Sequence, residues 1–246
     1  MVDLVIGELT PTDVVMAIAT GVIVSIVLTT AYYMSFSGMP KWKPRKLVHI
    51  SMGSVVGLTL VGYSNLSGPA FALGVFVLIL FYAWAHKSEL IWDLLMAGSR
   101  EGEKRSTTFL AGFMGMVSFC IVFLVFFSRP EIFVASILAV AWADGAGEAI
   151  GRPYGGRIFK RKYHNKSVEG SIAVFLFAIL AIVVSFVLYS SDTCIFCVFP
   201  HILLVAICVT VTEILSVGWS DNFIIPMITA IAMRLLIFPV DLLFFW

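Results

Sequence analysis

The stretch from Val168 to Ser191 has the sequence VEGSIAVFLFAILAIVVSFVLYSS, and it decides the class of fold. Glu169 is its one charged residue, and the remainder is an almost unbroken apolar run. A helix needs about 20 predominantly apolar residues to cross the hydrocarbon core of a bilayer. We therefore expect a transmembrane helix here, and runs of the same kind elsewhere predict the number of spans.

Similar apolar runs recur along the whole chain. Together with the first they cover residues of about 12–36, 47–63, 68–86, 107–127, 130–150, 168–191, 196–217 and 222–245. Of all residues, 60% are hydrophobic and 13% are charged, roughly half the charged fraction of a soluble domain. We predict an all-α fold, a polytopic membrane helix bundle of about eight transmembrane helices, organised as a single integral membrane domain over residues 1–246. The net charge of +1 gives no reason to expect nucleic-acid binding.

The basic residues predict the orientation of these helices. Lys and Arg gather after the first, third and fifth runs, whereas Arg129 is the one cation in the alternate segments. Because cytoplasmic segments carry an excess of Lys and Arg, we expect the basic segments in the cytoplasm and both termini outside. The acidic residues Asp3, Glu8 and Asp13 make a cleavable signal peptide unexpected. We expect a multi-pass protein of a prokaryotic cell membrane rather than of an organelle.

Polar residues from separate parts of the chain converge on the predicted cytoplasmic face. Asp144 and Glu148 end the fifth helix and, four residues apart, share one face of it. The other members open the second, sixth and eighth helices or end the seventh: Arg45, Lys46, His49, Lys166, Ser167, Glu169, Glu213, Asp221 and Asn222. Ionisable residues in a membrane are costly and usually functional. We therefore predict an active site at this face.

Asp144 and Glu148 suit a hard divalent cation. Mg²⁺ is usually held by one or two carboxylates together with the phosphates of a substrate. We predict that these two residues bind Mg²⁺ and that Arg152, four residues after Glu148, contacts phosphate. A solvated helix end, or an ion pair between Glu148 and Arg152, is the structural alternative.

The glycines around this acidic pair have two interpretations. Gly151, Gly155 and Gly156 lie where the fifth helix should end, and glycine permits turns and a close approach of the backbone to a ligand. We predict a phosphate-binding loop there. Gly145 is a further candidate contact, although Gly145 and Gly147 suit packing between membrane helices equally well.

Lys166, Ser167, Glu169 and Gly170 open the sixth helix. The free N–H groups and positive potential of a helix N-terminus favour an anion. We therefore predict that this element binds the phosphates of a nucleotide, with Lys166 also acting in catalysis. Helix capping by Ser167, with Glu169 favourable in the first turn, is the structural alternative for those two residues.

Three residues are candidate proton acceptors at the same face: Glu213, Asp221 and His49. The residues themselves do not choose among them, and His49 suits a structural role equally well. Arg234 lies about 12 residues, or roughly 18 Å at ~1.5 Å per residue, into the last apolar run. A cation at that depth needs a partner or a polar cavity.

Two smaller features leave alternatives open. Cys194 and Cys197 form a CxxC pair with no second pair nearby, so a zinc site is not expected, whereas a disulfide and two free thiols both fit. Residues 88–106 contain apolar side chains at helical spacing, which fits either a short interfacial helix or a solvated loop.

The polar motifs, in their order along the chain, resemble those of the polyprenol kinase family, which includes dolichol kinase and phytol kinase. An acidic residue at position 148 is more like the phytol kinase branch, and the chain is short for a eukaryotic dolichol kinase. The matching pieces are RKLVHI (45–50) with Gly53, Asp144-Gly145 with Glu148, Gly151-Arg152 with Gly155, KSVEG (166–170), and Thr212-Glu213 with Asp221-Asn222 and Pro226.

The resemblance implies a CTP-dependent, Mg²⁺-requiring kinase. Its substrate would be a membrane-dissolved isoprenoid alcohol, such as dolichol, phytol or geranylgeraniol, phosphorylated to the monophosphate at the cytoplasmic face. The residues by themselves predict a metal, a polyphosphate and a membrane, whereas CTP comes from the resemblance. In the implied site Asp144 and Glu148 hold Mg²⁺, and Lys166 and Arg152 neutralise phosphate oxygens.

Two other classes compete with this prediction. The CTP:phosphatidate cytidylyltransferases also combine an acidic, glycine-containing stretch with a Lys-x-x-Glu-Gly-like element, and they transfer a nucleotidyl group to a lipid phosphate. An ion or small-molecule transporter would also carry ionisable residues in its helices, but transporters favour midplane sites and inverted repeats. Here the ionisable residues gather at one face and no repeat is visible. The sequence does not predict the oligomeric state.

Overall fold

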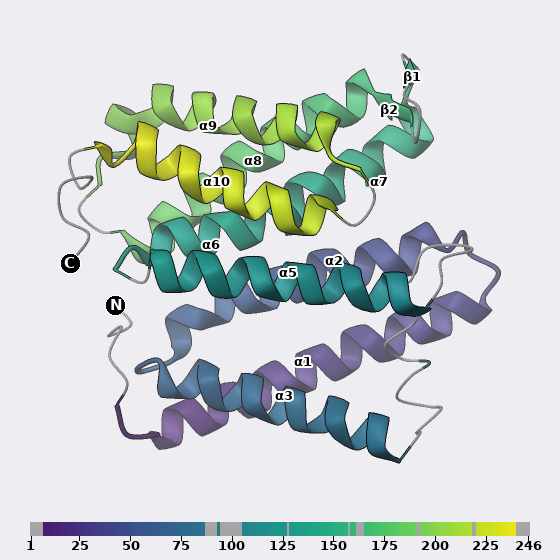
Figure 1. Ribbon diagram of the computed structural model, residues 1–246, viewed down its shortest axis with the longest axis vertical. Coiled ribbons are helices and arrows are strands. Elements are labelled where there is room, and N and C mark those ends of the chain that lie inside the picture. Colours follow the sequence, from purple (N-terminus) through teal and green to yellow (C-terminus); the bar gives the residue numbers. More distant parts are fainter. Residues whose placement is uncertain are drawn as a thin grey trace. The chain divides into compact units, whose positions relative to one another are not determined.

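The computed structural model describes residues 7–86, 93, 105–126, 128–156, 158–160, 165–190, 193–217 and 220–239. Helices occupy each of the predicted apolar runs (Figure 1). The expected all-α class is thus confirmed for these residues, apart from one short hairpin. The helices group into two compact units, Met1–Thr108 and Phe109–Trp246. The organisation as a single membrane domain stays a prediction.

The first unit is a packed group in which α1 contacts both α2 and α3. The start of α1 is fixed by Asp13, whose fully buried carboxylate accepts hydrogen bonds from the backbone N–H of Thr10 at 2.9 Å and of Ser64 at 2.8 Å. Asp13 therefore joins the first turn of α1 to the segment that leads into α3. The elements are α1 (Pro11–Phe36), α2 (Trp42–Thr59), η1 (Leu60–Gly62) and α3 (Ser67–Ala85).

The second unit is built around α8, which packs against α6, α7 and α9, while α10 packs against α9 and α6. Its elements are α5 (Arg105–Val125), α6 (Pro130–Leu138), η2 (Ala139–Asp144), α7 (Gly145–Tyr154), β1 (Ile158–Lys160), β2 (Asn165–Ser167), α8 (Val168–Tyr189), α9 (Ile195–Leu215) and α10 (Asp221–Leu236). α6, η2 and α7 form one run from Pro130 to Tyr154, and η2 is a π-helical turn within it. Figure 1 shows α7 and the hairpin at one end of this unit.

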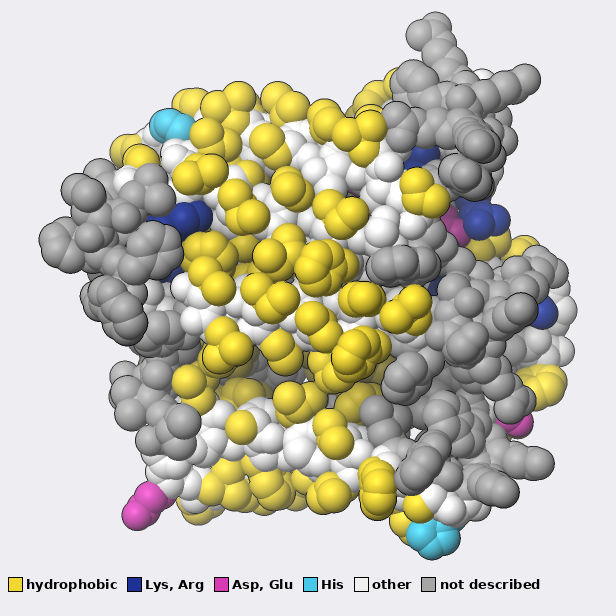
Figure 2. Space-filling view, viewed as in Figure 1, with side chains coloured by type: hydrophobic (Ala, Val, Ile, Leu, Met, Phe, Trp, Pro, Cys, Tyr) yellow, Lys and Arg dark blue, Asp and Glu magenta, His cyan; other side chains and the backbone are white. Residues whose placement is uncertain are grey.

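Helix α8 is apolar on every side, but only one side faces the core of the unit. Val174, Ala178 and Phe186 are fully buried, whereas Ile172 and Leu176 on the opposite side are 54% and 56% exposed. A helix that is hydrophobic all round belongs in a protein core or a membrane. In Figure 2 hydrophobic side chains likewise cover the outer surface of α9 and α10. Lipid explains these exposed apolar surfaces.

Among the residues that the structure describes, four helices are long and apolar enough to cross a membrane: Pro11–Phe36, Pro130–Tyr154, Val168–Tyr189 and Ile195–Leu215. Together with the composition they support an integral membrane protein. The total of eight spans and the outside location of both termini stay predictions. Residues 88–106, for which the sequence left an interfacial helix and a solvated loop open, lie almost entirely outside the described residues.

Some local expectations were wrong. α2 begins at Trp42 rather than near residue 47, so the basic residues before the second run belong to its first turns. α10 ends at Leu236, which puts Arg234 in its last turn instead of deep inside a long span. A cation in that position is favourable because the carbonyl end of a helix carries partial negative charge.

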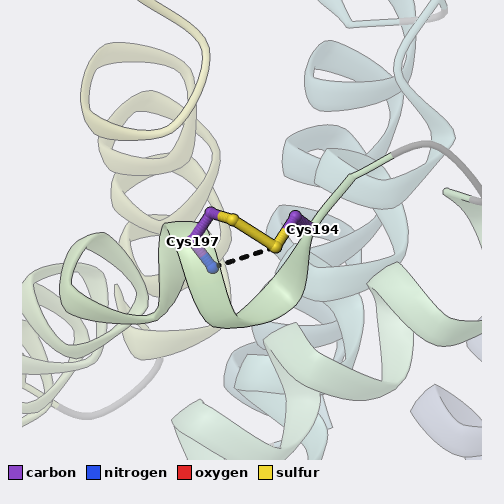
Figure 3. The surroundings of a disulfide bond; sticks show 2 residues. All are labelled: Cys194 and Cys197. Atoms are coloured by element: carbon purple, nitrogen blue, oxygen red, sulfur yellow. Dashed lines mark hydrogen bonds between the residues drawn. A yellow bond between two sulfur atoms is a disulfide. The ribbon is translucent and has the colours of Figure 1, made fainter.

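The two cysteines at the start of α9 are joined. Cys194 is the N-cap of α9, and its disulfide to Cys197 closes across the first turn (Figure 3). The Cys194 sulfur also accepts a hydrogen bond from the Cys197 N–H at 3.3 Å. Of the two alternatives that the sequence left open, the disulfide is therefore the one found.

Candidate functional site

Asp144 lies where the π turn η2 passes into α7. Asp144 is buried, with 6% of the residue exposed, and the five residues before it, Ala139–Ala143, are apolar. π turns within α-helices occur frequently at functional sites. Asp144, Gly147 and Gly151 then follow at helical spacing along one face of α7, and Glu148 lies beside that face.

Glu148 forms an ion pair with Arg152 on the same helix. The Arg152 Nε lies 2.8 Å from the Glu148 Oε1, and the side chains are 57% and 15% exposed. The sequence offered this pair as the structural alternative to metal binding. An i,i+4 pair of this kind stabilises a helix by only about 0.3–0.5 kcal/mol. A cation with bound phosphates would therefore separate the two side chains at small cost, leaving Glu148 for the metal and Arg152 for phosphate.

Lys166 and Glu213 form an ion pair that links two separate elements. Lys166 belongs to β2, which pairs antiparallel with β1 so that Lys166 lies opposite Phe159. Its ammonium donates a hydrogen bond to Oε1 of Glu213, near the end of α9. The Glu213 side chain is 5% exposed and that of Lys166 is 19% exposed. The pair therefore holds the partly exposed Lys166 ammonium against a buried carboxylate.

Helices α7 and α8 cross at a contact made by glycines. A methyl group on Gly147 would lie 2.6 Å from Val174 Cγ2 and 3.7 Å from the Glu213 Oε1. One on Gly170 would lie 2.8 Å from the carbonyl oxygen of Gly147 and 3.2 Å from Gly151 Cα. This crossing brings the face of α7 that carries Asp144 next to the Lys166–Glu213 pair.

The glycine contacts correct part of the predicted phosphate loop. Gly151 does not end the helix; it lies inside α7, which continues to Tyr154, and it packs against Gly170. Gly155 caps the helix with a φ of −69°, so no left-handed turn forms there. Gly145 is buried within the first turn of α7. Gly156 follows the end of the helix, as predicted, and it is exposed. Phosphate binding by these glycines stays a prediction.

Ser167 and Gly170 have clear structural roles. Ser167 is the N-cap of α8, and its hydroxyl accepts a hydrogen bond from the Gly170 N–H at 3.0 Å. The capping alternative is thus confirmed, and the N–H of Gly170 is already used. Glu169 lies in the first turn, where a carboxylate is favourable. Nucleotide binding by these three residues stays a prediction.

Asp221 and Asn222 open α10, as expected, and Asn222 fastens this helix to α5. The Asn222 side-chain amide donates to the carbonyl oxygen of Ala111 at 3.2 Å, and the backbone carbonyl of Asn222 accepts from the Ser118 hydroxyl at 3.1 Å. Asp221 is buried, and its Oδ1 accepts from the Asn222 N–H at 3.1 Å. These contacts give Asn222 a role in positioning α10.

Arg45, Lys46 and His49 lie near the start of α2, in the first unit. Lys46 is buried, with 3% exposed, while Arg45 and His49 are partly buried. That these three residues share a site with those of the second unit stays a prediction.

The donor set fits Mg²⁺ held jointly with a substrate. Within the described ranges no group of three or more His, Cys, Asp or Glu side chains gathers as it would in a metal cage made by protein alone. Mg²⁺ instead commonly takes one or two carboxylates, water and substrate phosphates. Asp144 and Glu148, one turn apart on α7, supply oxygen ligands of that kind.

Comparison with known proteins adds one relative. The chain is 26% identical over 220 residues to the CTP-dependent diacylglycerol kinase 1 of Eremothecium gossypii, and the similarity covers 79% of this chain and 67% of that protein. No protein-family profile matches the chain, and no solved structure matches it either. The chain is therefore similar to a CTP-dependent lipid kinase over most of its length.

Proposed function

We propose that this chain is a CTP-dependent lipid kinase, which transfers the γ-phosphoryl group of CTP to the hydroxyl of a lipid dissolved in the membrane. The observation that carries the proposal is the grouping of Asp144, Glu148, Arg152 and Lys166 around the α7–α8 crossing of an apolar helical unit. The similarity to a CTP-dependent diacylglycerol kinase supports both the nucleotide and the lipid.

In the proposed site, phosphoryl transfer depends on positioning and on neutralising charge more than on covalent chemistry. A bound Mg²⁺ would supply positive charge that offsets the negative charge of the phosphates. Asp144 and Glu148 would hold it, because they supply two carboxylates on adjacent turns of one helix. Arg152 would bind remaining phosphate oxygens after its release from Glu148, and Lys166 would bind them through the N–H groups that it does not donate to Glu213.

The chemical step joins the lipid hydroxyl oxygen to the γ-phosphorus of CTP and breaks the bond from that phosphorus to the β–γ bridging oxygen. CDP leaves, and the hydroxyl proton passes to a base. His49, Glu213 and Asp221 were the candidates for that base. Because Glu213 is engaged with Lys166, we propose that Glu213 positions Lys166. Asp221 then remains as the acceptor within the second unit, and the role of His49 stays a prediction.

Two classes of lipid alcohol fit the proposal. The motifs resemble those of kinases for isoprenoid alcohols, whereas the curated relative is named for diacylglycerol. Both substrates present one hydroxyl at the membrane surface on a large apolar body. We propose diacylglycerol as the first substrate to test, with phytol, geranylgeraniol and dolichol beside it. The predicted location in a prokaryotic cell membrane stays a prediction.

The test is an assay of the purified full chain in lipid nanodiscs with Mg²⁺ and CTP labelled at either the α- or the γ-phosphorus. A kinase moves the γ label to diacylglycerol or to an isoprenoid alcohol and releases CDP. A cytidylyltransferase moves the α label to phosphatidic acid and releases pyrophosphate. If neither label moves to any lipid, the proposal is wrong and a transporter or a non-catalytic protein becomes the better hypothesis.

A further inference from the structure

We infer that the apolar groove between α8 and α9 holds one hydrocarbon chain of the lipid alcohol. The inference deepens the proposed function, because it assigns a binding surface to the substrate of that site. The groove has a volume of about 280 Å³ and is lined by positions from Val168 to Phe175 on α8 and from Ile207 to Ile214 on α9.

The groove begins at the candidate active site. Val168 follows the cap residue Ser167, and Ile214 follows Glu213, so the ion pair formed by Lys166 and Glu213 stands at one end of the groove. From there it extends along about two turns of each helix, or roughly 10 Å at ~1.5 Å per residue. A lipid whose chain lies in the groove therefore has its hydroxyl end at Lys166.

The walls of the groove suit a hydrocarbon and nothing polar. Its two hydroxyl-bearing residues are turned back on their own helices: Ser171 donates to the Ser167 carbonyl at 3.1 Å, and Thr210 donates to the Ala206 carbonyl at 2.8 Å. The remaining lining is aliphatic or aromatic. Ile172, Ile207 and Val211 are 54%, 49% and 47% exposed, so the groove opens sideways to the bilayer and a lipid can enter without crossing a polar barrier.

The binding test uses photoreactive lipids and needs no catalysis. Diacylglycerol and geranylgeraniol, each with a diazirine in the chain, are incorporated into phosphatidylcholine nanodiscs with the full chain, without CTP. We expect cross-links within 168–175 or 207–214 that fall severalfold when the same unlabelled alcohol is added and are unchanged by more phosphatidylcholine. Cross-links elsewhere, or cross-links that phosphatidylcholine displaces equally well, would show that the groove holds only bulk lipid and would overturn the inference.

A second test fills the groove. Val211→Trp and Ile172→Trp should raise the KM for the lipid alcohol about tenfold, the effect of displacing about two methylene groups, with the KM for CTP unchanged. Val187→Trp is the matched control, since Val187 is 67% exposed on α8 beyond the groove. Equal effects in all three variants would count against the groove.

The two proposals fail separately. Displaceable cross-links in the groove without any phosphorylated product would support lipid binding in the groove and exclude the proposed kinase activity. A phosphorylated lipid, with cross-links confined to other helices, would support the proposed kinase activity and exclude lipid binding in the groove.

Discussion

Asp144 is the residue on which the proposed chemistry depends most. It is a buried carboxylate at the π turn, and Asp144→Asn keeps its shape while removing its charge. We expect turnover to fall at least about a hundredfold, since stabilisation by a bound metal is worth several kcal/mol. Glu148→Gln should raise the Mg²⁺ concentration needed for half-maximal rate. The measurement is turnover against Mg²⁺ concentration for each variant.

A control for Asp144 lies in the same continuous helix. Glu131 in α6 is also buried, at 3% exposed, and it pairs with Arg129 at 3.5 Å near the other end of the run. Glu131→Gln should lower stability without changing turnover per folded molecule. Near-normal turnover in Asp144→Asn, or an equal loss in Glu131→Gln, would exclude a metal-binding role for Asp144.

Lys166 and Glu213 offer a test that separates a functional cation from a structural pair. Lys166→Ala should slow transfer and weaken CTP binding roughly ten- to a hundredfold, because a charge-assisted contact is worth about 1.5–3 kcal/mol. The double variant Lys166→Glu with Glu213→Lys restores an ion pair of opposite direction. We expect it to recover the thermal stability of the wild type but not its turnover, as measured by thermal unfolding and labelled CTP.

Recovery of turnover by the double variant would show that the pair only holds β2 against α9.

Arg161→Ala is the comparison within the same basic segment. Arg161 lies outside the described residues and is predicted to be a topology anchor, so its loss should leave nucleotide affinity unchanged. If Arg161→Ala lost nucleotide affinity and turnover while Lys166→Ala kept both, the phosphate site would have to be assigned to the middle of that segment.

At the scale of elements, the crossing of α7 and α8 depends on glycine. Gly170→Ala puts a methyl group on α8 2.8 Å from the Gly147 carbonyl oxygen, which belongs to the backbone of α7 and not to a flexible side chain. We expect a loss of about 1–3 kcal/mol in stability, the usual cost of overpacking, together with lower turnover. Thermal unfolding in detergent and the kinase assay measure the two effects.

Gly112 is the matched glycine in the same unit, since a methyl group there meets nothing within 4 Å. Gly112→Ala in α5 should raise stability by about 0.5–1 kcal/mol, because alanine loses less conformational freedom than glycine in a helix. If both variants changed the stability of the protein in the same way, the α7–α8 crossing would have more space at Gly170 than the structure indicates.

For the whole molecule, the prediction concerns orientation in the membrane. The distribution of Lys and Arg puts the α8–α9 connection outside, and disulfides persist in oxidising compartments, which agrees with the Cys194–Cys197 bond. After reduction, these cysteines should react with a membrane-impermeant thiol reagent added to intact cells. Single cysteines replacing Lys43, Arg100 or Arg161 should react only after the membrane is opened. Labelling of Arg161→Cys in intact cells would reverse the orientation and place the site on the other side.

Much of the helical fold follows from the sequence because apolar runs of membrane length are a strong pattern, as at Val168–Tyr189. Helix capping by Ser167 could be offered as an alternative to phosphate binding, since serine before an apolar run is a common N-cap. The π turn was missed because an extra residue in a helix leaves no compositional trace in Ala139–Asp144. The hairpin was missed because a strongly basic segment lacks the alternation of a half-buried strand.

The site was predicted less completely than the fold. The acidic pair and the opening of α8 could be found because each lies within a few residues of sequence. The ion pair of Lys166 with Glu213 joins residues 47 positions apart, and only the packing of α9 against α8, the helix that follows β2, reveals it. The structural use of Gly151 was missed for the same reason, since its neighbour Gly170 belongs to another helix.

The π turn between α6 and α7 has a consequence for comparing this chain with others. An α-helix turns about 100° for each residue, and a π turn contains one residue more than the α-helical turn that it replaces. The whole of α7 is thereby out of phase with α6 by about a quarter of a revolution. Deleting any one residue of Ala139–Ala143 would rotate Asp144 about the helix axis, away from α8, although every motif remained intact. A homologous sequence with a one-residue gap in this stretch would therefore be expected to lack the activity, whatever acidic residue it keeps.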